Sequence, residues 1–255
     1  MKQVFCTVTL LLAMVWLQAV PAAAAGEIDM QLAEPVIRIS TFYNGTTVSL
    51  TGSLPADCDL VVQVSGPRKD VHLKVKGKVA GVLWMNKDDV SLKNTPAVYM
   101  VYTPAGTGEN LLDADLGLGY QALLKEIEIE PASADKEFIF GEYTKLMEKW
   151  NVYAVHRDAV SYGPVQGERK PFSLTLTIPP KMNAGAYRVE AVAVRDHGVI
   201  ARAETGLQIE LTGLPKLIAS LAFGQPLLFG IMAVVIAVGT GLIIGALFKG
   251  GGGGH

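Results

Sequence analysis

Residues 171–194, PFSLTLTIPPKMNAGAYRVEAVAV, decide the fold that we expect for this chain. Two runs in which apolar and polar residues alternate flank a turn that contains proline, asparagine and glycine. Alternation with a period of two is typical of β-strands, and the residue types between the two runs are those that favour turns. The stretch therefore predicts two strands joined by a corner.

Tyr187 begins the second of these strands, directly after the turn. In immunoglobulin-like sandwiches, a turn that contains proline and glycine leads into a late strand that begins with a tyrosine. Residues 178–194 resemble that corner. We therefore expect a mainly β chain with an immunoglobulin-like β-sandwich.

The alternating pattern continues on both sides of this stretch. Turn residues separate the runs at roughly 10-residue spacing, which predicts antiparallel strands of a sandwich or barrel. The runs are VIRIS (36–40), TTVSLTG (46–52), DLVVQVSG (59–66), VHLKVKG (71–77), GVLWMN (81–86), VYAVHRDAVSYG (152–163) and GVIARAETGLQIEL (198–211).

The middle of the chain has a different pattern. Residues 111–124 have helical character, and a second helix is predicted to follow with Asp135 as its N-cap. Its apolar face would contain Ile139, Tyr143, Leu146, Met147 and Trp150. Because strands resume directly afterwards, we expect one sandwich with a helical insertion near residues 104–150. Two small sandwiches in tandem are the alternative.

Two apolar segments lie outside this domain. Residues 1–25 have a basic start, an apolar core and a small-residue exit, which predicts a secretory signal peptide cut after Ala25 or, alternatively, an uncleaved anchor. Residues 226–248 contain no charge, and about 23 residues rising about 1.5 Å each give roughly 34 Å, enough to cross a ~30 Å hydrocarbon core. Lys249, directly after them, is typical of a cytoplasmic flank.

These features predict a single-pass protein of the bacterial inner membrane with its N-terminal domain in the periplasm. Its expected parts are a periplasmic β-sandwich domain (26–213), a juxtamembrane segment (214–225), a transmembrane helix (226–248) and a short glycine-rich cytoplasmic tail (249–255).

Charge and cysteine content narrow the classes of function. Three of the 22 Lys and Arg residues (Lys2, Lys216, Lys249) lie outside residues 26–213, whereas all 24 Asp and Glu residues lie inside that range. The domain is thus acidic, which argues against a nucleic-acid binder. Cys58 is its one cysteine, and the carboxylates on either side of it raise a thiol pKa, so we expect a structural or incidental role.

No sequence motif points to catalysis. The four histidines (His72, His156, His197, His255) lie in separate segments without the spacing of a zinc site, and no nucleophile elbow, phosphate-binding loop or dinucleotide fingerprint is present. We therefore expect no enzyme activity, no cofactor and no metal.

One strand is strongly basic. Alternation in GPRKDVHLKVKGK (66–78) places His72, Lys74, Lys76 and Lys78 on one face, and the candidate patch consists of Arg68, Lys69, His72, Lys74, Lys76 and Lys78. Such a stripe can meet a small anion, lipid headgroups or an acidic partner. The alternative is a sheet edge that lysines keep soluble and protect from edge pairing.

Two further features are candidates for contacts with other molecules. Trp84 and Asn86 share one strand face, which indicates either a recognition surface or a packed tryptophan beside an amide that satisfies a turn. In the predicted span, small residues recur every four positions, and they form a helix-packing face or reflect the frequency of such residues in spans. They are Ala233, Ala237, Gly241 and Gly245, with Gly230 three positions before the first.

Several stretches together resemble an uncharacterised family of putative transmembrane proteins first grouped from alphaproteobacteria. The resemblance covers nearly the whole chain after residue 25, and its most specific markers are Gly66, Pro67, Gly81, Trp84, Asn86, Pro96, Tyr99, Gly185, Tyr187 and the span entry PLLFG (226–230).

This resemblance implies a β-rich periplasmic domain with one C-terminal span, often encoded beside permeases of the TauE/SafE sulfite-exporter type. It favours an accessory or interaction subunit of a membrane transporter, with a polytopic permease or a second copy of the chain as partner. The alternative is an extracytoplasmic domain that binds or senses a small anion.

Overall fold

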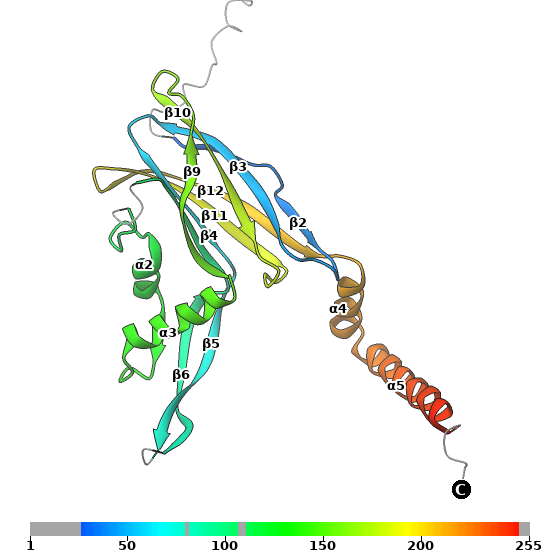
Figure 1. Ribbon diagram of the computed structural model, residues 1–255. Coiled ribbons are helices and arrows are strands. Elements are labelled where there is room, and N and C mark those ends of the chain that lie inside the picture. Colours follow the sequence, from blue (N-terminus) through cyan, green and yellow to red (C-terminus); the bar gives the residue numbers. More distant parts are fainter. Residues whose placement is uncertain (1–26, 80–81, 107–110, 250–255) are drawn as a thin grey trace, which may run out of the picture.

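The computed structural model describes residues 27–79, 82–106 and 111–249, and it is mainly β (Figure 1). The predicted signal peptide and residues 250–255 of the predicted tail lie outside the described residues. A curled sheet of nine strands forms the body, a sheet of three strands projects from it, and two helices follow at the C-terminal side.

The strands are β1 (Asp29–Leu32), β2 (Val36–Ile39), β3 (Thr46–Pro55), β4 (Asp59–Ser65), β5 (Arg68–Val79), β6 (Leu83–Pro96), β7 (Tyr99–Pro104), β8 (Glu128–Glu130), β9 (Tyr153–Tyr162), β10 (Arg169–Ile178), β11 (Gly185–Arg195) and β12 (Gly198–Leu211). The helices are α2 (Gly119–Glu126), α3 (Lys136–Lys149), α4 (Leu214–Gly224) and α5 (Pro226–Lys249).

The nine strands follow the order β1-β3-β10-β9-β7-β4-β11-β12-β2. The half that contains β3 and β10 faces the half that contains β4, β11 and β12, and β2 pairs in parallel with β12. This is the strand arrangement of an immunoglobulin-like sandwich, as predicted. Because β9 pairs with both β10 and β7, the two halves form one curled sheet, and the alternative of two sandwiches in tandem is wrong.

The alternation of apolar and polar residues in 171–178 determines which face of β10 is buried. Phe172, Leu174, Leu176 and Ile178 are buried, and the residues between them are exposed. This pattern is that of a strand with one face on the core and one on solvent.

Tyr187 forms the predicted corner. Its ring is buried at the start of β11, and its Oη donates a hydrogen bond of 2.8 Å to the carbonyl oxygen of Asn183. The turn between β10 and β11 is therefore held to the first strand residue that follows it, as in other sandwiches of this class.

The insertion between β7 and β9 contains the two predicted helices and the strand β8. Asp135 caps α3 by accepting a hydrogen bond of 3.1 Å from the backbone N–H of Phe138. The buried face of α3 consists of Ile139, Phe140, Tyr143, Thr144 and Met147. Trp150, predicted for this face, is instead exposed, and the Nζ of Lys181 lies 5.0 Å from its ring centroid.

The insertion explains why β4 is buried on both faces. All residues from Leu60 to Val64 are buried, although alternate side chains of a strand point to opposite faces. The second face lies under the insertion, where the Nε2 of Gln63 donates a hydrogen bond of 3.3 Å to the carbonyl oxygen of Gly117.

The strands β5 and β6 differ from the prediction in their location. They form a long hairpin that pairs with β8 and lies outside the sandwich. Only its base reaches the core: Val71 pairs with Leu92, and Leu92 pairs with Ile129 of β8. Leu92 and Ile129 are part of the hydrophobic core of the domain, and the half-buried Val71 and Leu73 pack against that core.

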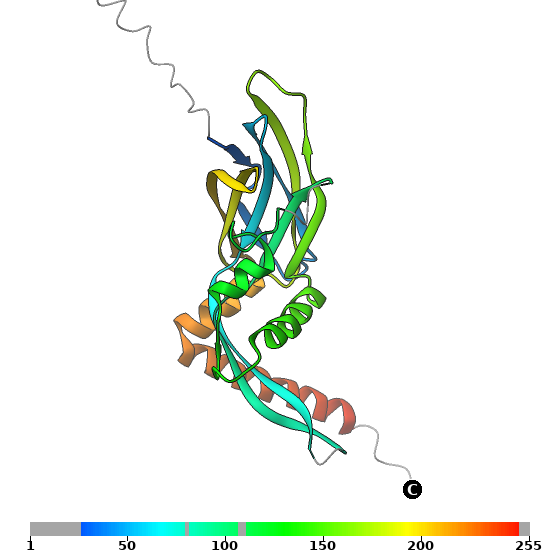
Figure 2. The same ribbon diagram turned by 90° about the vertical axis from the view of Figure 1, so that its left-hand side faces the viewer.

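The register of the sheet sends this hairpin and the C-terminal helices out of the same end of the sandwich. Arg188 of β11 pairs with Ser65, the last residue of β4, and on its other side with Gly206 of β12. The strand β12 runs on from there to Leu211, after which α4 begins. Figures 1 and 2 show the hairpin and α5 extending from this end.

We predict that Tyr187→Phe lowers the stability of the domain. The substitution keeps the buried ring but removes the donor to the Asn183 carbonyl, and the loss of one such hydrogen bond costs about 1 kcal/mol. Thermal unfolding of the full chain in detergent, followed by far-UV circular dichroism, measures the change.

Asn183→Ala is the matched control, because the acceptor is a backbone atom that this substitution retains. It should unfold within about 0.5 kcal/mol of the unaltered protein, as exposed substitutions usually do. Equal melting of Tyr187→Phe and the unaltered protein would contradict a stabilising corner.

Candidate interaction surfaces

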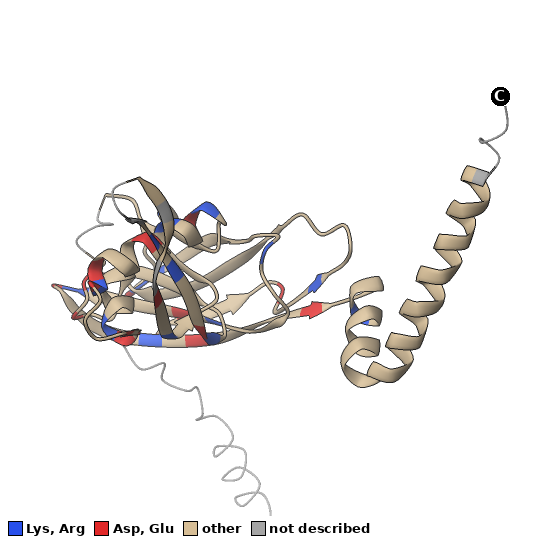
Figure 3. Cartoon of the chain, turned by 90° about the horizontal axis from the view of Figure 1, so that it is seen from below, with Lys and Arg blue, Asp and Glu red and all other residues tan. Residues whose placement is uncertain are grey.

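The helix α5 has the properties of a membrane span. Its segment Pro226–Phe248 has 23 residues, and the most apolar stretch of 18 residues within it has a mean hydropathy of 2.7 and contains no buried residue. Figure 3 shows no Lys, Arg, Asp or Glu along this segment. Thr240 donates its hydroxyl to the carbonyl oxygen of Ile236 at 2.7 Å, so the helix itself satisfies this polar group.

The small residues of α5 face open space in this chain. A Cβ atom built on Gly230, Gly241 or Gly245 would meet no atom within 4 Å outside the helix backbone. Ala233 and Ala237 are exposed as well. The row is therefore open along its length, and a second helix could approach it closely, which is how helices associate in lipid.

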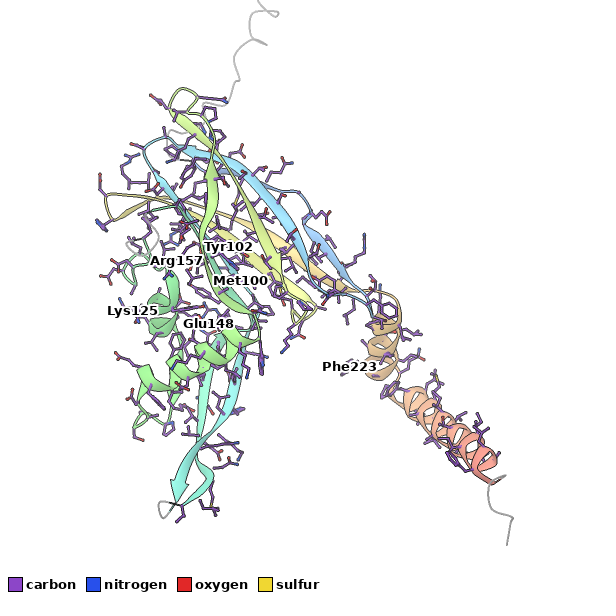
Figure 4. All side chains as sticks on the ribbon, in the orientation of Figure 1. Met100, Tyr102, Lys125, Glu148, Arg157 and Phe223 are labelled. Carbon is purple, nitrogen blue, oxygen red and sulfur yellow. The ribbon has the colours of Figure 1, made fainter. Side chains whose placement is uncertain are left out.

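The helix α4 connects the sandwich to this span and is also apolar. It contains one charged residue, Lys216, and no residue of it is buried. Phe223, at the junction with α5, is 89% exposed and points away from the helix (Figure 4). Apolar exposed side chains thus continue from the span toward the sandwich.

Ion pairs neutralise part of the basic strand. Arg68 pairs with Glu126 of α2 and donates a hydrogen bond of 3.1 Å from Nη1 to the carbonyl oxygen of Asn94. The Nζ of Lys74 lies 3.1 Å from an oxygen of Asp89 on the neighbouring strand. These two cations therefore serve contacts within the chain.

Three other predicted members of the basic patch, Lys69, His72 and Lys76, are exposed residues of β5. His72 shares a hydrogen bond of 2.7 Å with the hydroxyl of Ser91. Lys78 lies in the strand, but its side chain is outside the described part. Because β5 is an edge strand of the three-stranded sheet, its lysines also suit the alternative of edge protection.

Trp84 and Asn86 lie near the tip of the hairpin. Asn86 is exposed and pairs with Lys76, and Trp84 pairs with Lys78. The side chain of Trp84 is outside the described part. The predicted recognition surface thus stands apart from the sandwich, and it stays a prediction.

Sequence analysis did not find the cluster of four tyrosines that joins the insertion to the sandwich. Tyr153 lies at the centre, with ring centroids 6.0 Å from Tyr99, 6.2 Å from Tyr120 and 5.8 Å from Tyr143. Two of these residues come from sandwich strands and two from insertion helices. The one sequence signal is a continuous apolar run at 98–102, which indicates a strand buried on both faces.

Two hydroxyl groups of this cluster, those of Tyr99 and Tyr153, form buried hydrogen bonds within the protein. Tyr99 donates to Gln63, and its oxygen also lies 3.1 Å from the carbonyl oxygen of Gly119, while Tyr153 donates to the carbonyl oxygen of Pro96 at 2.7 Å. Burial raises the pKa of Tyr99 and of Tyr153 well above the ordinary value. Both hydroxyls therefore stay neutral donors that hold structure.

A cleft of about 500 Å³ opens between the start of β9 and the end of β10. These two strands pair at Phe172 with Tyr162 and at Ser173 with Ser161, away from the cleft. His156 lines it and stacks on Tyr102, with ring centroids 4.6 Å apart. Burial lowers the pKa of His156 below 6.5 and raises that of Tyr102 to about 12. Both rings are therefore uncharged at neutral pH.

Cys58 is buried, and its location agrees with a structural role. Burial raises the pKa of its thiol, with the neighbouring Asp57 acting in the same direction and Arg195, whose Nη2 lies 3.5 Å from the sulfur, opposing it. Within the described ranges, no three His, Cys, Asp or Glu side chains are grouped closely enough to hold a metal ion.

We predict that His156 makes the fold less stable in mild acid. Unfolded chains protonate a histidine near pH 6.5, whereas the folded protein does so at a lower pH, so the unfolded state binds more protons between these values. Stability should thus fall as the pH drops below about 6.5 and stop falling from this cause below the folded pKa.

In His156→Phe, which retains an aromatic ring on Tyr102, the decrease in melting temperature between pH 8 and pH 5 should be smaller than in the unaltered protein. Melting at pH 8, where the histidine is neutral in both states, measures the cost of the substitution itself. An unchanged decrease would show that His156 does not contribute to the pH dependence.

Comparison with known proteins agrees with this architecture. A family model described as "Putative transmembrane protein (Alph_Pro_TM)" matches residues 27–250, a range that includes the sandwich, its insertion and the apolar helix. A search of curated proteins finds no match. The chain therefore belongs to the Alph_Pro_TM family of transmembrane proteins.

Proposed function

We propose that this protein is a non-enzymatic, single-pass accessory subunit of a membrane transporter. Its β-sandwich stands in the periplasm of a bacterial cell, and its span packs against a helix of a polytopic permease in the inner membrane. The resemblance described above suggests a permease that exports a sulfur oxyanion.

The observation that carries this proposal is the open face of small residues on α5. Lipid gives helices no hydrophobic reason to associate, so close backbone approach is what a packing face must offer. Gly230, Gly241 and Gly245 offer that approach, and no side chain of the described chain occupies the face.

The reactive groups of the domain support a role in binding rather than catalysis. Burial raises the pKa of the Cys58 thiol, the His156 ring is stacked, and the hydroxyls of Tyr99 and Tyr153 donate to groups of the same chain. We do not propose an anion sensor, because the ion pairs of Arg68 and Lys74 reduce the charge that β5 offers to an anion.

We predict that Gly241→Leu together with Gly245→Leu weakens association with the permease. The two leucines fill the groove and keep the backbones apart, while the span stays apolar enough to insert. Affinity purification from native membranes, followed by mass spectrometry and cross-linking, measures the yield of the permease and of any dimer of this chain.

Gly239→Leu is the matched control, because it adds the same side chain to the same helix outside the row of small residues. It should leave the yield of permease unchanged. Loss of a dimer without loss of any permease would contradict the transporter subunit, and equal yields for all variants would mean that α5 is only an anchor.

A further inference from the structure

The distal part of the β5–β6 hairpin has an unusual composition. Residues 76–87, KGKVAGVLWMNK, contain three lysines, no acidic residue and a run of apolar residues. Of the described side chains, Val82 is 84% exposed and Leu83 is 61% exposed, and Met85 is exposed as well. Large apolar side chains at the end of a projecting hairpin require an explanation, since nothing in the described chain covers them.

The lengths of β5 and α4 indicate what covers these apolar side chains. The strand β5 has 12 residues, which at about 3.3 Å per residue extend roughly 40 Å. The helix α4, which connects the same end of the sandwich to the span, has 11 residues and a length of about 16 Å. A hairpin that is longer than the tether, and that leaves from the same end, is long enough to touch a membrane that α5 spans.

The chemistry of the hairpin suits that membrane. Exposed apolar side chains can enter the boundary between headgroups and acyl chains, while lysines remain among the headgroups. Lys76 lies on the exposed face of β5, and Lys78 and Lys87 adjoin the apolar run in the sequence. Lysines near an anionic bilayer add binding energy that neutral lipid does not supply.

A third segment of the same end has a similar feature. Phe42 lies in the loop after β2, and its side chain is 94% exposed. The last residue of β2, Ile39, pairs with Leu211 at the end of β12. The loop that contains Phe42 therefore lies beside the start of α4. An exposed aromatic side chain at this position suits a domain whose end rests on a bilayer.

We propose that the end of the β5–β6 hairpin docks into the outer boundary of the bilayer, with Val82, Leu83 and Met85 among the lipids and Lys76 on anionic headgroups. The domain then contacts the membrane at two places, the span and the hairpin, which fixes its orientation on the surface. This inference is independent of any permease partner.

Site-specific fluorescence in proteoliposomes tests this proposal. The full chain with Cys6→Ser and Cys58→Ala receives one exposed cysteine for a polarity-sensitive dye, at Leu83→Cys or at Val165→Cys. Val165 is the matched control, because it is similarly exposed, at 58%, and lies in the loop between β9 and β10 at the opposite end of the sandwich.

In vesicles of phosphatidylcholine and phosphatidylglycerol, the dye at position 83 should be quenched by brominated lipid and protected from iodide in the water. The dye at position 165 should show the reverse. Equal access of iodide to both positions would overturn the proposal. Protection from iodide without quenching by brominated lipid would also overturn it, because protein would then cover the tip.

Charge and apolar variants separate the two contributions. On vesicles with phosphatidylglycerol, Lys76→Gln should lower the ratio of docked to free hairpin about fivefold, with little effect on pure phosphatidylcholine. Lys145→Gln on α3 is the control, and it should leave this ratio unchanged on both kinds of vesicle.

The apolar contribution is tested with the dye at Met85→Cys. There, Leu83→Asp should reduce quenching by brominated lipid on both kinds of vesicle, and an unaffected signal would contradict insertion.

Discussion

The antiparallel register of β4, β11 and β12 is the constraint on which the rest of the molecule depends. Because Ser65 and Gly206 both pair with Arg188, the chain leaves β4 and β12 at one end of the sandwich. The β5–β6 hairpin begins after β4 at this end, and the helices α4 and α5 begin after β12 at the same end. A shift of this register by one residue would also turn the buried face of β12, with Leu207 and Ile209, toward solvent, so core packing and orientation are set together.

The insertion adds a second layer on the outside of this sheet. It covers β4 and β7, and its contacts include a buried amide, Gln63, that accepts a hydrogen bond from Tyr99 and donates one to Gly117. Buried polar groups are costly when they lose partners, so the fit of the insertion is specific rather than merely apolar. The same insertion supplies β8, which pairs with β6 and supports the base of the hairpin.

Local patterns predicted much of the fold. Alternation identified the strands, the sequence before Tyr187 identified the corner, and the capping of α3 by Asp135 was predicted from one residue and its spacing. The location of β5 and β6 could not be predicted, because VHLKVKG alternates in the same way whether it packs on a sandwich or on an insertion. The tyrosine cluster was missed for a related reason, since its members are far apart in the sequence and only the insertion brings them together.

We infer that this end of the sandwich faces the membrane and touches it. Specular neutron reflectivity of the full chain in a single supported bilayer, with deuterated lipid to separate protein from lipid, measures protein density along the membrane normal. We expect protein density in the headgroup layer beyond that of one helix, continuous with the domain above it. A layer of water between the headgroups and the domain, crossed only by the density of a single helix, would contradict it.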